Sequence, residues 1–236
     1  MHIHTPETEV PALIYKDDEL IVINKPAGLL AIQDGYDPSL SHLKQILEPQ
    51  HGPLWIIHRL DKETSGVMVI ARNPQAHRIL NARFRERQVE KFYHGLVLPK
   101  PDWREIEIKL PLQPNADRKH RTRVDRKSGK SAHTICRVLK WFDLGVLMSI
   151  QIMTGITHQI RAHLRAHELV LLGDKLYATG LDLPEISTPR MMLHARNLAF
   201  DHPFSGERLN FSANYPEDFR EAYARVKLST VQDAMT

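Results

Sequence analysis

The sequence predicts an α+β fold, in which a single domain is built around a mixed, largely antiparallel β-sheet flanked by helices and loops. Three observations lead to this prediction. Short apolar segments typical of strands outnumber the helical segments, the helices are interspersed among them, and a strict strand–helix–strand alternation is absent. The chain has 236 residues, 42% of them hydrophobic and 25% charged, so it is long enough to bury a real core.

The N-terminal half begins with strands. The segment LIYKDDELIVINKPAGLL predicts two strands joined by an Asp-Asp turn and followed by a Lys-Pro-Ala-Gly turn. Apolar residues at helical spacing predict a helix over 39–49 that Pro49 ends. Two short strands, PLWII and GVMVIA, come next. A helix then begins with Asn73 as N-cap and Pro74 as its first residue, and the strand VEKFYHGLVLP follows it.

The C-terminal half continues the pattern. SAHTICRVLKWF and GVLMSIQIM predict two strands joined by an Asp-Leu-Gly turn, and a helix is expected over 157–169 with Thr157 as its cap. VLLGDKLYA predicts a strand and a loop. MMLHARNLAFDHPFSGERLNFSANYP predicts two strands around a Pro-Phe-Ser-Gly turn, and a short helix is expected over 217–225.

The polar ends of the chain are expected to be flexible, and the sequence shows no internal repeat or linker. This predicts three parts with the boundaries 1–11, 12–225 and 226–236. The first twenty residues lack the apolar core of a secretion signal, and no run approaches the roughly 18 apolar residues of a membrane span. The single cysteine, Cys136, excludes an intrachain disulfide. We therefore expect a cytoplasmic protein with no membrane partner, and a monomer by default.

Positive charge is concentrated in one segment of a chain whose net charge is +4. Residues 118–130, RKHRTRVDRKSGK, carry seven Lys or Arg residues and one acidic residue, Asp125. Such a segment is either a solvated loop or a contact for the phosphates of a nucleic acid. The segment alone leaves both interpretations open.

Two kinds of site are disfavoured. The segment SGKS resembles the end of a phosphate-binding P-loop, but Val124 stands where that motif requires glycine, and a strand follows rather than a helix. His163 and His167 are four residues apart, as zinc ligands on a helix can be. Arg161 and Arg165 would repel a cation there, and no glutamate lies between the histidines to act as a base. We therefore expect no metal.

The segment IIHRLDKETSG, residues 56–66, places a carboxylate among cations between two apolar strands. Asp61 is surrounded in sequence by His58, Arg59 and Lys62. Neighbouring cations favour the ionised carboxylate, and the strands would hold it still. An ionised aspartate is a competent nucleophile or base. A structural turn closed by a salt bridge is the alternative interpretation.

The predicted helix at 157–169 is a candidate anion site. His158, Arg161 and Arg165 fall at i, i+3 and i+7 along one stripe, and a glycine turn precedes the helix. The free N–H groups of its first turn add positive potential at the same end. This stripe could receive a phosphate or a carboxylate such as Asp61, or it could be a solvated basic face.

HRLDKETSG resembles the signature of the RluA-type pseudouridine synthases. Four further segments resemble the other blocks of that family in the same order: IVINKPAGLL, VEKFYHGLV, TGITHQIRAHL with LLGDKLY, and LHARNLAFDHPFSGE. The resemblance covers roughly residues 12–217. It implies a pseudouridine-synthase-like catalytic domain that isomerises uridine to pseudouridine in rRNA or tRNA without a metal or cofactor.

The resemblance also implies roles for individual residues. Asp61 matches the catalytic carboxylate, Arg161 the arginine that pairs with it, and Tyr93 the tyrosine that lies against the target base. Arg59 matches the arginine that helps to hold the flipped-out nucleotide, for which an aromatic or guanidinium plane is suited. Further contacts to the substrate, including phosphate contacts that weaken with salt, are expected from His58, Lys91, His158, Arg165, Leu193, Arg118, Arg121 and Arg123.

Two departures from the family pattern limit what it implies. Ile156 stands where the family usually has Arg or Lys, which removes one expected phosphate contact. No S4 RNA-binding domain precedes the catalytic blocks, so RNA selection is expected from the core or its loops. A non-catalytic RNA-binding or remodelling protein on the same fold is the alternative, and a metal-dependent nuclease is a third possibility. The sequence leaves open whether Asp61 attacks ribose, adds to the base or removes a ribose proton.

Overall fold

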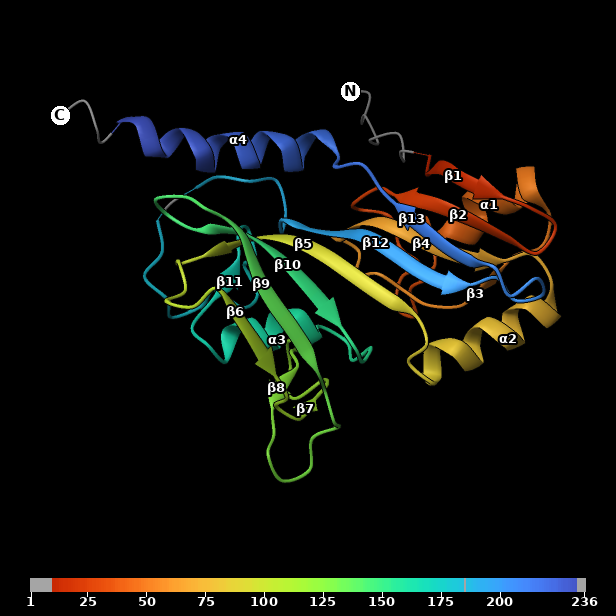
Figure 1. Ribbon diagram of the computed structural model, residues 1–236, viewed down its shortest axis with the longest axis horizontal. Coiled ribbons are helices and arrows are strands. Elements are labelled where there is room, and N and C mark those ends of the chain that lie inside the picture. The colour runs from red at the N-terminus through yellow and green to blue at the C-terminus, as the bar shows by residue number, and fades with distance from the viewer. Residues whose placement is uncertain (1–9, 185, 233–236) are drawn as a thin grey trace.

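Within residues 10–184 and 186–232, which this computed structural model describes, an 11-stranded mixed sheet carries four helices (Figure 1). The elements of the first half are β1 (Ala12–Lys16), β2 (Leu20–Lys25), α1 (Leu43–His51), β3 (Trp55–Ile56), β4 (Ser65–Ala71), α2 (Pro74–Arg85), β5 (Glu90–Leu98), β6 (Glu105–Ile108), β7 (Leu112–Gln113) and β8 (Arg123–Val124). Those of the second half are β9 (Thr134–Trp141), β10 (Val146–Ile152), α3 (Gln159–Arg165), β11 (Val170–Leu171), β12 (Leu193–Asp201), β13 (Arg208–Ser212) and α4 (Glu217–Gln232).

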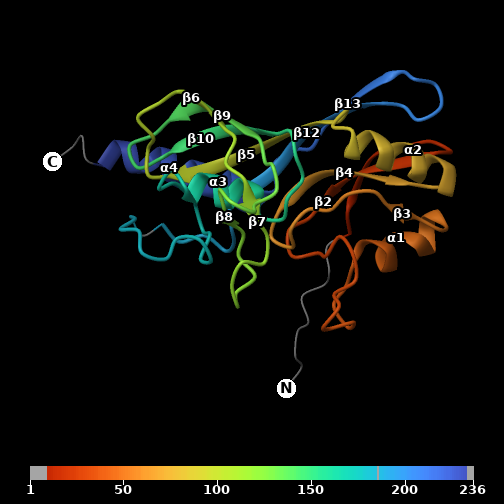
Figure 2. The ribbon, with the colours of Figure 1, turned by 90° about the horizontal axis from the view of Figure 1, so that it is seen from below.

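The sheet follows the order β1-β2-β4-β12-β5-β10-β9-β6, with β3 beside β4, β11 beside β5 and β13 beside β12. Its strand pairs are antiparallel except for β4 and β12, which are parallel. The small pair β7–β8 is separate. The predicted α+β fold with a mixed, largely antiparallel sheet is therefore confirmed. In both views, α1 and α2 lie near one end of the sheet and α3 and α4 near the other (Figure 2).

Alternation along β5 sends its side chains into two cores. Tyr93 and Val97 join the main core, which also contains Ile160 of α3. Leu96 and Leu98 point the other way, into a core that α4 closes with Phe219, Ala222 and Val226. Because successive side chains of a strand face opposite sides of a sheet, α3 and α4 cover opposite faces of β5. Tyr93 consequently lies on the α3 face.

Two predicted helix boundaries are wrong for identifiable reasons. Pro49 lies inside α1 rather than ending it, and the helix stops at Gly52, whose left-handed backbone (φ 75°) closes it through an N–H bond to the Glu48 carbonyl. Thr157 does not cap α3. His158 occupies the N-cap with no side-chain cap bond, and the side chain of Gln159 accepts the N–H of Ile156.

The ends of α3 and α4 also differ from expectation, whereas the start of α2 is confirmed. α3 ends at Arg165, not at residue 169, and α4 continues past 225 to Gln232 with Val226 buried. The predicted end of this helix at residue 225 is therefore too early. At α2, Asn73 Oδ1 accepts the N–H of Ala76, and Pro74 is the first helical residue. The expected flexible ends fall largely on residues 1–9 and 233–236, which lie outside the described residues.

Gly66 permits the one parallel contact of the sheet. The backbone of β4 meets β12 with Ser65 opposite His194 and Gly66 opposite Ala195. Gly66 has φ 121°, and a Cβ placed on it would lie 2.2 Å from the carbonyl oxygen of Ala195. Both the backbone angle and the close approach require glycine, which explains the last letter of HRLDKETSG.

Replacing Gly66 with alanine should therefore destabilise the fold by about 3 kcal/mol, because backbone strain and an overlap with β12 add together. Urea unfolding would measure this difference. Gly35→Ala is the matched control, since a Cβ there meets nothing within 4 Å and the backbone is not left-handed. It should stay within about 1 kcal/mol of the wild type. Equal stability of the two variants would contradict this account of β4.

Among the described residues, no helix combines the length and apolar character needed to cross a membrane.

Candidate active site

Asp61 lies in the connection between β3 and β4, and other segments hold this turn by its carbonyl groups. The Lys62 carbonyl accepts the N–H of Gly28 at 2.8 Å. The Glu63 carbonyl accepts a guanidinium N–H of Arg190 at 2.9 Å. Backbone just after β2 and a side chain just before β12 therefore fix the turn from two sides.

The buried side chain of Lys25 lies beneath the same turn. Its Nζ donates to the carbonyls of Pro26 and Leu29 at 2.8 Å each and to that of Lys62 at 3.4 Å. Burial lowers the pKa of Lys25 to about 7, with Arg190 acting in the same direction and Asp61 opposing it. The Lys-Pro-Ala-Gly turn thus supports the turn that carries Asp61.

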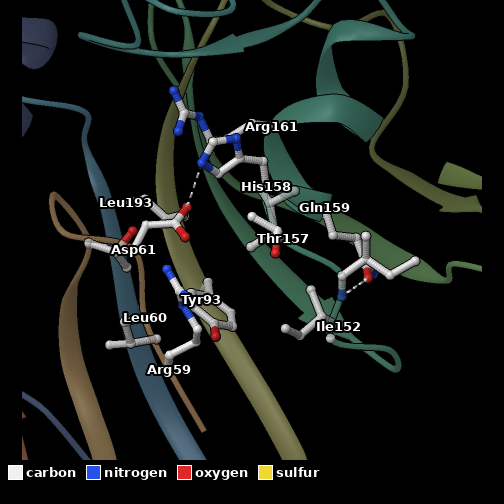
Figure 3. Close-up of a pocket in the computed structure, with 14 residues that line it drawn as sticks. Arg59, Leu60, Asp61, Tyr93, Ile152, Thr157, His158, Gln159, Arg161 and Leu193 are labelled. Carbon is white, nitrogen blue, oxygen red and sulfur yellow. Dashed lines mark hydrogen bonds and ion pairs between the residues drawn. The ribbon is translucent and has the colours of Figure 1, made fainter. Parts of the chain in front are cut away.

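Asp61 opens onto a pocket between this turn, β5, β12 and the start of α3 (Figure 3). We call it the Asp61 pocket; it encloses about 130 Å³. This is below the roughly 300 Å³ at which sites for drug-sized ligands begin, and it suits one base-sized ring. The predicted residues that line it are Arg59, Asp61, Tyr93, His158, Arg161 and Leu193.

The titratable side chain that faces Asp61 directly is that of His158. Its Nε2 lies 3.8 Å from Asp61 Oδ2, and the two side chains are 17% and 25% exposed. Tyr93 is buried in the wall of the pocket, and burial raises the pKa of its hydroxyl, with Asp61 adding to the effect. Arg59 is exposed at the mouth of the pocket. The Asp61 carboxylate is thus accessible from the pocket, although most of its surroundings are protein side chains.

The prediction that Arg161 pairs directly with Asp61 is wrong. Arg161 makes a two-pronged ion pair with Asp174, with Nε and Nη2 each 2.7 Å from a carboxylate oxygen. Burial opposes the charge on Arg161, but Asp174, and more weakly Asp61, raise its pKa. Its guanidinium also lies 4.7 Å from the ring centre of Tyr177. Arg161 therefore acts on Asp61 through its field and leaves both carboxylate oxygens free of an arginine.

His58 was expected to add to the positive field around Asp61, but it does not. Its ring stacks on Phe84 with centroids 4.6 Å apart, and its Nε2 accepts the N–H of Val69 at 3.2 Å. Burial, with a smaller contribution from Lys91, lowers its pKa to about 3. The imidazole is neutral and ties the HRLD segment to β4 and α2.

His58, His94 and His194 should make the fold sensitive to acid. Burial lowers their pKa values from 6.5 to about 3, about 4 and about 4. Below pH 6.5 the unfolded chain therefore binds more protons than the folded chain. The stability is fully present above pH 6.5 and is lost as the pH falls from 6.5 toward the pKa values of the folded state. We expect a loss on the order of 2 kcal/mol per histidine in urea unfolding at pH 4 relative to pH 7. His58→Gln should flatten this slope, and an unchanged slope would contradict the assignment.

A groove with several cations adjoins the pocket and shares Arg59, Tyr93 and Ile156 with it. Its further cationic side chains are those of Arg85, Arg87, Lys91 and Lys130. We call this the basic groove. Lys91, predicted from the Lys-x-Tyr strand, is largely buried there, and its ammonium lies 5.7 Å from the ring centre of Phe84. Ile156 contributes an apolar wall where the family usually has a cation.

The remaining predicted cations do not reach the Asp61 pocket. Arg165 lines a separate hollow with Arg121 and Arg123, so the predicted stripe along α3 divides between two sites. Asp117 binds both Arg121 and Arg123, at 2.7 Å and 2.8 Å. Arg118 is exposed in the β7–β8 connection and lines neither the pocket nor the groove.

Two residues of the site were not predicted from the sequence. Asp174 belongs to the segment LLGDKLY, and Arg190 directly precedes the segment MMLHARNLAF. Arg190 binds Asp218 of α4 through two bonds at 2.6 Å and 2.9 Å while donating to the Glu63 carbonyl. In the sequence, the available signal for Arg190 was its position directly before an apolar run. Its partner, Asp218, could not be inferred because it is 28 residues away in α4.

His163 is occupied in the core. Its Nδ1 lies 2.8 Å from Thr134 Oγ1 and its Nε2 lies 2.9 Å from the Leu110 carbonyl. In the part of the chain that the structure describes, no three His, Cys, Asp or Glu side chains are grouped to hold a metal ion.

Comparison with known proteins agrees with this geometry. Residues 19–166 match the model of the RNA pseudouridylate synthase family. The chain is 36% identical over 217 residues to the dual-specificity RNA pseudouridine synthase RluA of Pasteurella multocida, a match covering 89% of this chain and 96% of the relative. It is 38% identical over 249 residues to an RNA pseudouridine synthase named as uncharacterized from Aquifex aeolicus, covering 94% and 78%.

The fold is also shared with a solved structure. Human RNA pseudouridylate synthase domain containing 4 has 27% sequence identity and a TM-score of 0.75, over 91% of this chain and 92% of that one. Sequence blocks, fold and pocket thus lead to one assignment. The chain belongs to the RNA pseudouridylate synthase family and is an RNA-modifying isomerase.

Proposed function

We propose that this RNA pseudouridine synthase acts on uridines of rRNA or tRNA with Asp61 as its catalytic carboxylate. The observation that supports this most is the position of Asp61. Its side chain faces a pocket the size of one base, on a turn held by Gly28 and Arg190, and no arginine occupies its oxygens. A fixed, accessible carboxylate of this kind can serve as a nucleophile or base.

The reaction needs a flipped base at this carboxylate. The bond from N1 to C1′ breaks, the uracil turns, C5 bonds to C1′, and the proton on C5 leaves. Extruding the base from its stack costs a few kcal/mol, so groups must hold it outside. Tyr93 offers an aromatic surface inside the pocket, and Arg59 offers a guanidinium plane at its mouth.

The basic groove gives the flanking RNA backbone a path to the pocket. Arg59 belongs to both cavities, so phosphates bound along Arg85, Arg87, Lys91 and Lys130 would bring the target nucleotide to Asp61. Such contacts lose strength as salt rises. The hollow of Arg121, Arg123 and Arg165 is proposed as a more distant phosphate contact.

The proposal includes a monomer that works in the cytoplasm without a metal or cofactor. The chemistry described above uses a carboxylate, aromatic and guanidinium surfaces, and proton transfer, all of which the pocket side chains supply. The RluA relative is named for dual specificity, so we propose that both rRNA and tRNA should be tested as substrates.

Incubation of the purified chain with transcribed rRNA and tRNA, followed by chemical mapping of pseudouridine, tests the proposal. We expect pseudouridine at one or a few uridines, without added metal and in the presence of a chelator. Mapping cellular RNA with and without the gene would then identify the physiological position. Absence of pseudouridine from every RNA in both experiments would overturn the proposed function.

A further inference from the structure

The final step of the isomerisation requires a base, whichever way Asp61 acts. Once C5 has bonded to C1′, it carries the ribose carbon and its original hydrogen together. The ring becomes that of pseudouridine only when this proton leaves. A group that can accept a proton must therefore reach C5 within the Asp61 pocket. The inference below rests on the proposed function.

Few side chains that line the pocket can accept a proton. Arg59 and Arg161 stay protonated at any ordinary pH. Tyr93 would have to ionise first, and burial and the charge of Asp61 raise the pKa of its hydroxyl far above neutrality. The amide of Gln159 and the hydroxyls of the two threonines are not bases. Of the lining side chains, this leaves Asp61 and His158.

His158 is held where it can reach a group bound against Asp61. Its Nε2 is 3.8 Å from Asp61 Oδ2, and its ring meets Tyr177 edge to face with centroids 5.9 Å apart. Figure 3 shows the imidazole between Arg161 and the Asp61 carboxylate. The backbone of His158 is left-handed, with φ 54° and ψ 22°, at the N-cap of α3. A non-glycine residue in that conformation is uncommon and worth a functional explanation.

The contacts of Tyr177 determine which nitrogen of His158 carries the proton. The Tyr177 hydroxyl donates to the Thr122 carbonyl at 3.1 Å and accepts the N–H of Thr122 at 2.7 Å. Its remaining lone pair faces His158 Nδ1 at 3.4 Å and can accept a hydrogen bond from an N–H there. The hydrogen of the neutral ring then sits on Nδ1, and the lone pair on Nε2 faces the pocket.

We propose that His158 is the catalytic base that removes the C5 proton. Nε2 takes the proton, the electron pair of the C5–H bond forms the C5–C6 double bond, and the pair of the N1–C6 double bond moves onto N1. N1 takes a proton from water, and His158 later returns its proton to water, so protons and electrons balance. The Asp61 carboxylate stabilises the imidazolium while it exists.

The surroundings keep His158 neutral before it acts. Burial lowers its pKa most, Arg161 and Arg59 act in the same direction, and Asp61 and Asp174 oppose them. The net direction is downward, so the imidazole is unprotonated at neutral pH and available as a base.

His158→Asn is the most informative variant. Asparagine tolerates a left-handed backbone better than most residues, and its amide can reach the place of Nδ1 beside Tyr177, but it is not a base. We expect the single-turnover rate of His158→Asn to be about 10²- to 10⁴-fold below that of the wild type. RNA that carries deuterium at C5 of the target uridine gives the isotope effect for each enzyme. The isotope effect should be larger than that of the wild type, because C5 deprotonation becomes the slow step. RNA affinity should change by less than about 3-fold.

Tyr177→Phe is the second variant, and it removes the hydroxyl that selects the tautomer and that also bonds the backbone of Thr122. It should lower the rate less than His158→Asn and also raise the isotope effect, which keeps the test valid if the first variant fails to fold.

Two outcomes would overturn the inference. One is a His158→Asn rate within about 3-fold of the wild type, well short of what loss of a catalytic base removes. The other is a reduced rate with an unchanged isotope effect, which would leave His158 a positioning residue and Asp61 the base. Wild-type enzyme in the same assay separates the two proposals, because a failure of the proposed function would show as no pseudouridine from the wild type.

Discussion

Replacing Asp61 with asparagine should lower pseudouridine formation by more than about 10⁴-fold, the scale on which enzymes lose rate when their reacting group is removed. Asparagine keeps the shape of the side chain and one oxygen, but it can neither attack as an anion nor accept a proton. RNA binding should change by less than about 3-fold, since we propose that the affinity comes from phosphate contacts in the basic groove. Single-turnover rates and filter-binding affinities on one transcribed RNA would measure both quantities.

Asp102→Asn provides the matched control for this prediction. Asp102 is an exposed carboxylate in the connection between β5 and β6 and does not line the Asp61 pocket. Its replacement changes the net charge by the same amount and should leave the rate unchanged. Activity of Asp61→Asn above about a tenth of the wild-type rate would remove Asp61 from the chemistry, because the remaining side chains alone could not explain such a rate.

Replacing Asp174 with asparagine should destabilise the fold by about 3–5 kcal/mol, because it leaves the Arg161 guanidinium buried without a counter-charge. The two side chains of the pair are 9% and 1% exposed. Asp174 also accepts the N–H groups of Leu176 and Tyr177, so its loss loosens the segment after β11. For a chain of this length, the expected fall in melting temperature is roughly 6–20 °C. Thermal unfolding followed by circular dichroism would measure it.

Glu221→Gln breaks an exposed pair and serves as the control. Glu221 and Arg225 lie 3.4 Å apart on α4 with side chains 56% and 55% exposed, and such pairs contribute about 0.5 kcal/mol or less. If Asp174→Asn cost no more than this control, Arg161 would have to find its support elsewhere, and the assignment of Asp174 as its anchor would be wrong.

The Arg161–Asp174 pair also explains how Asp61 can lie beside an arginine without pairing with it. A carboxylate held by both prongs of a guanidinium has its lone pairs engaged and is a poor nucleophile. Because Asp174 occupies Arg161, the oxygens of Asp61 remain available to substrate and to His158. The Arg161 guanidinium still interacts electrostatically with Asp61, which contributes to raising the pKa of Arg161.

Local sequence was informative where neighbouring residues determine the structure. The strands IVIN and VMVI follow from runs of apolar, mostly β-branched residues, and the cap at Asn73 follows from a bond to the N–H of Ala76, so each was predicted. A turn at HRLDKETSG was also predicted, although distant residues hold it in place. The short strands β6, β7 and β8 were not, because two to four residues gain their strand character only from a partner elsewhere in the sheet. Pro49 was misjudged because a nearby glycine with a left-handed backbone, Gly52, ends α1.

By itself the sequence determined the fold class and the family blocks, and with them the residues that gather at the Asp61 pocket: Arg59, Asp61, Tyr93, His158, Arg161 and Leu193. Only the tertiary structure decided which charges meet. Arg161 takes Asp174, Arg190 takes Asp218, His58 stacks on Phe84, and His158 faces Asp61. The physical reason is that a strand or helix signal is local, whereas a buried charge selects its partner by distance and desolvation after the sheet has closed.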